Sequence, residues 1–267
     1  MVNVRGSAMK SISINQQPFL LVVALTIWLL SHSTWAATVW QLDIQGAIGP
    51  ATADYVVRGL ADAHTANAEL VILRIDTPGG LDKSMRFIIK HILASPTPVV
   101  SYVAPAGSRA ASAGTYILYA SHIAVMAPAT NLGAATPVQI QPPTPSIADK
   151  DPNNEGAKST APSSAMERKI INDAVAYIEG LASLRGRNAE FAIKAVREGA
   201  SLSAQEALEE YVIALIAENM ESLLEQLHGW SISMSDGDRV VQTADALVMR
   251  YEADWRNQFL SVITDPN

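Results

Sequence analysis

The 267-residue sequence contains no cysteine. This absence excludes disulfide bonds, a thiol nucleophile and every metal site that uses thiolate ligands. The five histidines are spread over positions 32, 64, 91, 122 and 228, and no two of them have the close spacing of a metal-binding helix. The sequence therefore predicts a protein that needs neither a metal ion nor a cofactor.

Positive charge is also scarce. The chain carries 19 Lys and Arg against 26 Asp and Glu, which gives a formal net charge of −7, and its basic residues form no stripe. Binding to nucleic acid requires clustered Lys and Arg that face the phosphates. Nucleic acid is therefore excluded as a partner.

Long hydrophobic runs are missing, apart from one near the N-terminus. Residues 1–36 contain Arg5 and Lys10, then an apolar run over 19–30, and then the small residues Thr34 and Ala36. This order is typical of a secretory signal peptide that is cleaved after Ala36. An uncleaved anchor is the alternative, although the run is shorter than the roughly 20 residues that span a bilayer. The sequence thus predicts an exported protein whose mature domain covers 37–267.

The first half of the mature domain alternates between strand and helix patterns. Four apolar runs have the length and composition of strands: 39–44, 70–75, 98–103 and 123–127. Amphipathic helices are predicted between them, the first of which begins at Pro50. Such alternation indicates a parallel sheet with right-handed crossovers, so the predicted fold class is α/β.

The second half is less regular. Residues 141–164 contain many prolines and few large apolar side chains, which predicts a mobile loop or lid. A long helix over 166–184 follows, and Ser203 with Glu206 fits a capping box. We further predict a strand over 211–217, a helix over 220–227, a hairpin that turns at 236–237 and an amphipathic helix over 247–263.

Two stretches carry the candidate chemistry. Gly107 to Tyr116 has almost no large side chains, with Ser112 at its centre and a predicted helix directly after it. A serine in a first helical turn lies among unpaired N–H groups that stabilise negative charge. The second stretch, Asp76 to Gly80, is a glycine-rich turn at the carboxyl end of a strand, where sites form in α/β sheets. The Ser112 stretch departs from the Gly-x-Ser-x-Gly pattern of the nucleophile elbow at its first glycine.

The combination of Asp-Thr-Pro-Gly-Gly-Leu at 76–81 with Ala-Ala-Ser-Ala-Gly-Thr-Tyr-Ile at 110–117 resembles the NfeD family of membrane-associated serine proteases. This family lies within the larger group of Clp protease and signal peptide peptidase A, and the resemblance covers 39–267. It implies a Clp protease/crotonase-like fold of repeated ββα and βαβ units, with a mainly parallel sheet and flanking helices. It also implies a serine endopeptidase.

A serine hydroxyl is a weak nucleophile and needs a base within hydrogen-bond reach. In Clp protease this base is a histidine, but Ala135 or Thr136 occupies the matching place in this sequence. His122 follows the serine, yet the predicted helix separates it from Ser112 by about 15 Å. A Ser-His-Asp triad is therefore not expected.

The resemblance implies a lysine base instead, since NfeD-type proteases place one just beyond the flexible loop, at the start of a long helix. The matching residue is Lys169, and Lys150 and Lys158 inside the loop are reserve candidates. An ordinary lysine is almost wholly charged at neutral pH. We therefore expect Met166 and Ile170 to shield Lys169 from water, which favours the neutral form.

The resemblance also guides the placement of an oxyanion hole, which needs two backbone donors that face the carbonyl oxygen. Gly80, with Gly79 beside it in the turn, and Ala113 at the start of the helix supply the candidate N–H groups. Asp76 is interpreted as a turn residue without a catalytic role.

Three function classes remain open. The first is an exported Ser-Lys endopeptidase that cleaves hydrophobic segments of membrane-associated proteins, with a stomatin-family protein as the partner that the resemblance implies. The second is a non-catalytic membrane-assembly scaffold. The third is an acyl-CoA hydratase or isomerase, against which the predicted leader argues because coenzyme A is cytosolic. The family further implies a homodimer or higher homo-oligomer, in the periplasm or another extracytoplasmic compartment, associated with the inner membrane in the full-length form.

Overall fold

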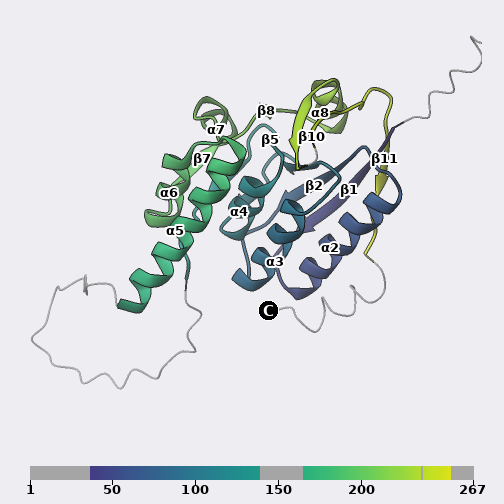
Figure 1. Ribbon diagram of the computed structural model, residues 1–267. Helices are drawn as coiled ribbons and strands as arrows, with labels where there is room; N and C mark the ends of the chain where they lie inside the picture. Colours follow the sequence, from purple (N-terminus) through teal and green to yellow (C-terminus); the bar gives the residue numbers. More distant parts are fainter. Residues whose placement is uncertain (1–36, 139–164, 236, 254–267) are drawn as a thin grey trace, which may run out of the picture. The chain divides into compact units, whose positions relative to one another are not determined.

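The computed structural model describes residues 37–138, 165–235 and 237–253. The predicted leader at 1–36 and the predicted loop at 141–164 lie outside the described residues. The described part is α/β, with one large sheet and helices packed against it (Figure 1). Every helix in these ranges is too short or too polar to span a lipid bilayer.

Six parallel strands form the large sheet. In spatial order they are β11 (Leu247–Arg250), β1 (Thr38–Gln45), β2 (Leu70–Asp76), β3 (Val99–Val103), β5 (Ile123–Met126) and β8 (Leu215–Ile216). The central strand β3 is buried along its whole length, as expected for a parallel strand that is covered on both faces. The predicted parallel α/β sheet is therefore confirmed.

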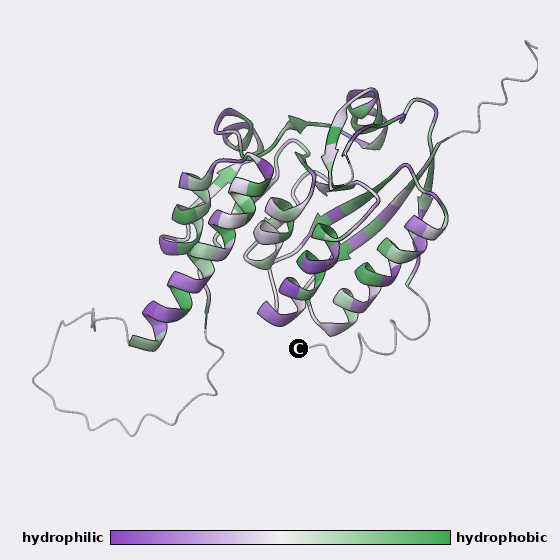
Figure 2. Cartoon of the chain, in the orientation of Figure 1, coloured by the Kyte–Doolittle hydropathy of each residue, from purple (hydrophilic) through white to green (hydrophobic). Residues whose placement is uncertain are grey.

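Alternate residues of these strands point to opposite faces of the sheet and build two apolar cores. Leu73 and Ile75 belong to the larger core, whereas Ile72 belongs to the smaller one. The larger core is formed with α2 (Pro50–Thr65), α3 (Asp82–Leu93), α4 (Ala113–Ala120), α5 (Ala165–Arg185), α6 (Ala189–Arg197) and α7 (Ala204–Glu209). The smaller core is formed with α8 (Met220–Leu227) and the hairpin of β9 (Ser231–Met234) and β10 (Gly237–Val240). Figure 2 shows the alternating apolar and polar patches along α2 and α3 that this packing requires.

A second, smaller sheet joins β4 (Arg109–Ala111), β6 (Asn131–Gly133) and β7 (Ser201–Ser203). Strands β4 and β6 are parallel, and β6 and β7 are antiparallel. This sheet is absent from the sequence-based prediction because three residues are too few to show an alternating pattern. It matters for function because β4 ends directly before Ser112.

Two expectations about the secondary structure after residue 210 are wrong. Residues 247–250 form β11, which pairs with β1, instead of opening an amphipathic helix, and 254–267 lie outside the described residues. The strand expected over 211–217 is confined to β8, because Tyr211 is 80% exposed and has a left-handed φ of 59°. The capping box of Ser203 and Glu206 is confirmed, and so is the antiparallel pairing of the hairpin.

Candidate active site

Ser112 lies at the sharp junction between β4 and α4. Its backbone has φ 52° and ψ −117°, a left-handed conformation that a serine adopts only when its surroundings hold it there. The Ser112 N–H donates to Gly133 O at 3.0 Å, and the residue stays partly exposed. Ser112 is thus the N-cap of α4 rather than part of its first turn. This strained strand-to-helix junction corresponds to a nucleophile elbow although the glycine pattern is incomplete.

The glycine turn comes very close to this serine. A Cβ atom built on Gly79 would lie 2.6 Å from Ser112 Cβ and 3.0 Å from Ser112 Oγ. Gly79 also has a φ of 119°, which glycine adopts without the strain that other residues suffer. The fold therefore brings together the two stretches that the sequence singled out.

Thr77 holds the glycine turn in place. Its fully buried hydroxyl donates to Gly46 O at 2.6 Å and accepts the Gly79 N–H at 3.0 Å. The Thr77 N–H donates to Arg109 O at 2.8 Å, and Ala111 N–H donates to Thr77 O at 3.1 Å. The turn and the strand that delivers the serine are thus fixed to each other.

Two backbone N–H groups remain available beside the serine. Gly80 forms an isolated bridge with Ile48, in which Ile48 N–H donates to Gly79 O at 2.8 Å. Among the residues that the structure describes, neither the Gly80 N–H nor the Ala113 N–H donates a hydrogen bond. Ala113 opens α4, where the first N–H groups have no partner within the helix. Donors of this kind are what an oxyanion hole requires.

Thr115 and Gly133 complete the frame, although the sequence pattern predicts a role for neither of them. The buried Thr115 hydroxyl lies 2.8 Å from Ala110 O and 3.0 Å from Gly133 O, and it accepts the Gly133 N–H at 3.1 Å. A Cβ on Gly133 would lie 2.3 Å from Ala200 O, so the backbones approach too closely for a side chain. The glycine itself is the one sequence signal, since glycine is used where two backbones approach closely.

Helix α5 lies beside α4 and runs in the same direction (Figure 1). Near the middle of the pair, the Tyr116 and Tyr177 rings stack with their centroids 6.1 Å apart. Near the C-terminal ends, Arg185 Nε donates to Ala120 O at 2.8 Å. Later residues of one helix therefore meet later residues of the other, and the two N-termini lie at the same end of the pair.

Lys169 lies at this N-terminal end of α5. Ser112 lies four residues before Tyr116, and Lys169 lies eight residues before Tyr177 on α5. At a helical rise of about 1.5 Å per residue, these separations are about 6 Å and about 12 Å along the respective helix axes. Lys169 is exposed, Met166 is 62% exposed and Ile170 is only partly buried. The expectation that these neighbours shield the lysine from water is therefore wrong for the described chain.

A side-chain cluster joins α3 to α5 one helical turn from Lys169. Arg86 Nε donates to Asp82 at 3.0 Å within α3, and Arg86 Nη2 donates to Asp173 at 2.6 Å on α5. The guanidinium carbon also lies 4.3 Å from the centroid of the Tyr177 ring, within the range of a cation–π contact. The cluster therefore links α3 to α5 one helical turn from Lys169.

His122 is not placed to serve as the base. It follows the C-terminal end of α4, and its Nδ1 accepts the Val99 N–H at 3.1 Å. Burial, followed by the charges of Arg185 and Arg187, lowers the pKa of His122 to about 3. The histidine is neutral and lies at the opposite end of the helix from Ser112, which agrees with the expectation of no Ser-His-Asp triad.

Ala135 and Asp76 have structural roles. Ala135 is buried, and its carbonyl accepts the Tyr116 hydroxyl at 3.4 Å. Asp76 Oδ1 accepts the Arg109 N–H at 3.2 Å, which agrees with its interpretation as a turn residue. In the described ranges, no group of three or more His, Asp or Glu side chains is arranged to hold a metal ion.

Comparisons with known proteins agree with this architecture. The family model described as "NfeD1b, N-terminal domain" matches residues 38–229. The membrane-bound protease PH1510 of Pyrococcus horikoshii is 35% identical over 250 residues, which are 93% of this chain and 53% of that protein. The membrane protein NfeD1b of Bacillus subtilis is 42% identical over 105 residues, which are 39% of this chain and 23% of that protein. The chain thus spans about half, or less, of the curated relatives that it matches.

Solved structures of the 1510-N membrane-bound stomatin-specific protease share the fold. One is a variant in which a lysine is replaced by alanine, in complex with a substrate peptide; its TM-score is 0.71 at 31% identity, over 86% of this chain and 99% of that chain. A second is a variant in which a serine is replaced by alanine, with a TM-score of 0.70 at 32% identity, over 82% of this chain and 99% of that chain. The predicted Clp-type α/β fold is confirmed.

Proposed function

Because the chain belongs to the family of the NfeD1b N-terminal domain, we propose that it is a serine endopeptidase with Ser112 as nucleophile and Lys169 as general base. The observation that carries this proposal is the strained Ser112 backbone in contact with Gly79. Backbone strain of this kind is concentrated at functional sites. The comparisons support it, since one relative is named a protease and its solved variants replace a serine and a lysine.

In the proposed reaction, neutral Lys169 accepts the hydroxyl proton of Ser112 while Oγ attacks the scissile carbonyl carbon. The N–H groups of Gly80 and Ala113 donate to the oxygen that becomes negative, and the dipole of α4 adds to this stabilisation. The peptide C–N bond then breaks, and the lysine returns the proton to the leaving amine. Water then gives a proton to the same lysine and attacks the acyl carbon, the ester bond to Ser112 Oγ breaks, and the lysine returns the proton to Oγ as the acid product leaves.

The proposed substrate is a hydrophobic segment of a membrane-associated protein. Exposed apolar side chains flank the site on two elements, Leu81 at 48% directly after Gly80 and Met166 at 62% near Lys169. An extended apolar peptide that covers them excludes water from the lysine and so favours its neutral form. The shielding that the free chain lacks is then supplied by the substrate.

The proposed partner is a stomatin-family protein, because the matching solved proteases are named as specific for stomatin. The proposal also includes an extracytoplasmic, membrane-proximal location and a homodimer or higher homo-oligomer. The membrane-bound description of the relatives supports the location.

The test is cleavage of a hydrophobic stomatin-derived peptide by the full chain in detergent, followed by mass spectrometry. Ser112→Ala is expected to lower kcat by about 10³-fold or more. Ser183→Ala, at an exposed serine near the other end of α5, is the matched control and should retain activity. Cleavage by Ser112→Ala at the rate of the parent chain would overturn the assignment.

One observation favours a second candidate, the non-catalytic membrane-assembly scaffold. Lys169 is exposed, and Met166 and Ile170 do not cover it, whereas a lysine that acts as a general base is expected to be shielded from water. A scaffold binds the same peptide but releases no fragments, and Ser112→Ala then binds it equally well. Peptide binding without any cleavage by the parent chain would select this candidate.

A further inference from the structure

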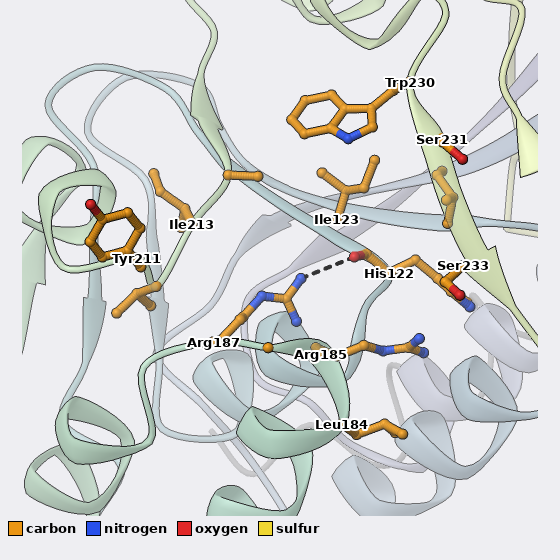
Figure 3. Close-up of a pocket in the computed structure, with 14 residues that line it drawn as sticks. His122, Ile123, Leu184, Arg185, Arg187, Tyr211, Ile213, Trp230, Ser231 and Ser233 are labelled. Carbon is orange, nitrogen blue, oxygen red and sulfur yellow. Dashed lines mark hydrogen bonds between the residues drawn. The ribbon is translucent and has the colours of Figure 1, made fainter. Parts of the chain in front are cut away.

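A pocket of about 400 Å³ is lined by His122 and other residues (Figure 3). His122 follows the C-terminal end of α4, whereas Ser112 is the N-cap of that helix. Arg185 and Arg187 come from the end of α5 and the segment after it, and Trp230 with Ser231 and Ser233 comes from β9 and the residue before it. Apolar side chains, including Ile123, line the rest. The pocket therefore combines two cations with an apolar and aromatic wall.

The two arginines bind main-chain carbonyls at the end of α4. Arg187 Nη1 donates to Tyr119 O at 2.7 Å and Nη2 donates to His122 O at 3.3 Å, while Arg185 Nε donates to Ala120 O at 2.8 Å. A guanidinium carries five N–H donors, so capping of the helix uses only part of this capacity. In the part of the chain that the structure describes, no salt bridge includes either arginine.

The electrostatics of the pocket favour an anion. Burial lowers the pKa of both Arg185 and Arg187, and for Arg187 the second cause is the charge of Arg185, which brings its pKa to about 9. His122 lines the same pocket and is neutral, and the lining residues include no Asp or Glu, so the two arginines determine the charge of the lining. Two like charges held against an apolar wall are stabilised by an anion between them.

We propose that this pocket binds a small organic oxyanion, a carboxylate or phosphate group carried on an apolar body. The planar guanidinium of Arg185 offers both terminal nitrogens to such a group, in the geometry that pairs two N–H donors with two oxygens. The indole of Trp230 and the side chain of Ile123 supply the surface for the apolar body. The site is separate from Ser112 and does not depend on the proposed peptidase activity.

Titration calorimetry of the full chain in detergent, at constant ionic strength, tests this site. The probes are phenylacetate, phenyl phosphate and inorganic phosphate. At least one phenyl-bearing anion is expected to bind about tenfold more tightly than inorganic phosphate, because only the former uses the apolar wall. The tighter of the two phenyl-bearing anions identifies the head group. No binding of either at millimolar concentration would overturn the proposal.

Two variants separate a binding site from simple helix capping. Arg185→Gln keeps an amide donor for Ala120 O but loses the charge, so it should weaken binding by about tenfold or more. Arg197→Gln, at an exposed arginine at the end of α6, should leave binding unchanged. Ser233→Glu introduces a carboxylate into the pocket, and we expect it to block the probes and raise the melting temperature. Unchanged affinity in Arg185→Gln or in Ser233→Glu would contradict the assignment.

Discussion

The two ends of helix α4 are built in opposite ways. At the N-terminal end, the N–H groups of Ala113 and nearby Gly80 donate no hydrogen bond within the described residues, and Ser112 is held in a strained conformation. At the C-terminal end, the carbonyls of Tyr119 and Ala120 are each bonded to an arginine. One end therefore offers rigid main-chain donors to a developing negative charge, whereas the other carries its positive charge on side chains.

Helix α5 repeats this contrast along its own length. Its C-terminal end is anchored to α4 through Arg185, while its N-terminal end presents Lys169 on an exposed surface. Within the described residues, the Arg86 cluster links that end to α3 through Asp173 and the Tyr177 ring. The serine half of the proposed site is thus preformed, and the lysine half depends on the placement of a helix end and on the substrate.

The largest expected effect concerns the charge of the base. Lys169→Arg should lower kcat/KM as much as Lys169→Ala, by about 10²- to 10⁴-fold, because a guanidinium does not lose its proton. Arg168→Lys, at the neighbouring position, is the control. A Lys169→Arg variant with a tenth of the parent activity would rule out Lys169 as the base.

The second effect concerns the preformed half. Gly79→Ala places a Cβ 2.6 Å from Ser112 Cβ, so it should displace the serine and lower kcat by about 10²-fold. Gly107→Ala is the matched control, because Gly107 also has a positive φ, 88°, but open space around it. Both variants carry backbone strain, and only the first touches the nucleophile. Equal losses of kcat in the two variants would mean that backbone strain, and not the contact with Ser112, lowers the activity.

The serine half could be predicted from the sequence because its signals are local. The small residues around Ser112 and the paired glycines at 79 and 80 indicate positions where atoms lie too close together for larger side chains. The structure brings these two stretches into contact, as expected. Thr115 and Gly133 were missed because their roles depend on β6, a three-residue strand with no readable pattern.

The lysine half was predicted less well for a different reason. The position of Lys169 on a helix follows from periodicity, but its exposure depends on what packs against that helix, which no local pattern specifies. The same limit explains 247–250, where four residues that suited an amphipathic helix instead add a strand beside β1. Tertiary pairing decided the conformation there, and local propensity did not.

The third effect concerns the C-terminal end of α4 and is measured as stability. The pKa of His122 is lowered to about 3 in the folded chain, against about 6.5 in an unfolded one. The unfolded chain therefore binds more protons below pH 6.5, and the free energy of unfolding falls as pH falls from 6.5 toward 3. At pH 5 the loss amounts to as much as about 2 kcal/mol.

His122→Asn removes this titration while keeping a side-chain acceptor for the Val99 N–H. Denaturant unfolding of the parent and the variant between pH 7 and pH 5 checks the effect, and the variant should show a flatter dependence on pH. His64→Asn, at an exposed histidine, is the control. If the free energy of unfolding depends on pH as steeply in His122→Asn as in the parent chain, groups other than His122 take up the protons on unfolding.

The smallest expected effect tests whether the Arg86 cluster acts through Lys169. Arg86→Gln removes the ion pair with Asp173 and the contact with the Tyr177 ring. Both contacts are partly exposed, and together they contribute about 1 kcal/mol or less of interaction free energy. We therefore expect kcat to fall about threefold to fivefold with little change in KM. Asp54→Asn, which breaks a comparable pair on α2, should have no effect.

A double-mutant cycle then distinguishes positioning from general destabilisation. If Arg86 serves only to hold the helix end that carries the base, Arg86→Gln should cause no further loss in the Lys169→Ala background, because the group that it positions is already gone. A loss of the same factor in both backgrounds would show that the cluster supports the fold rather than the lysine. Arg86→Lys should recover part of the activity through Asp173, and the remaining deficit then measures the contribution of the planar contact with Tyr177.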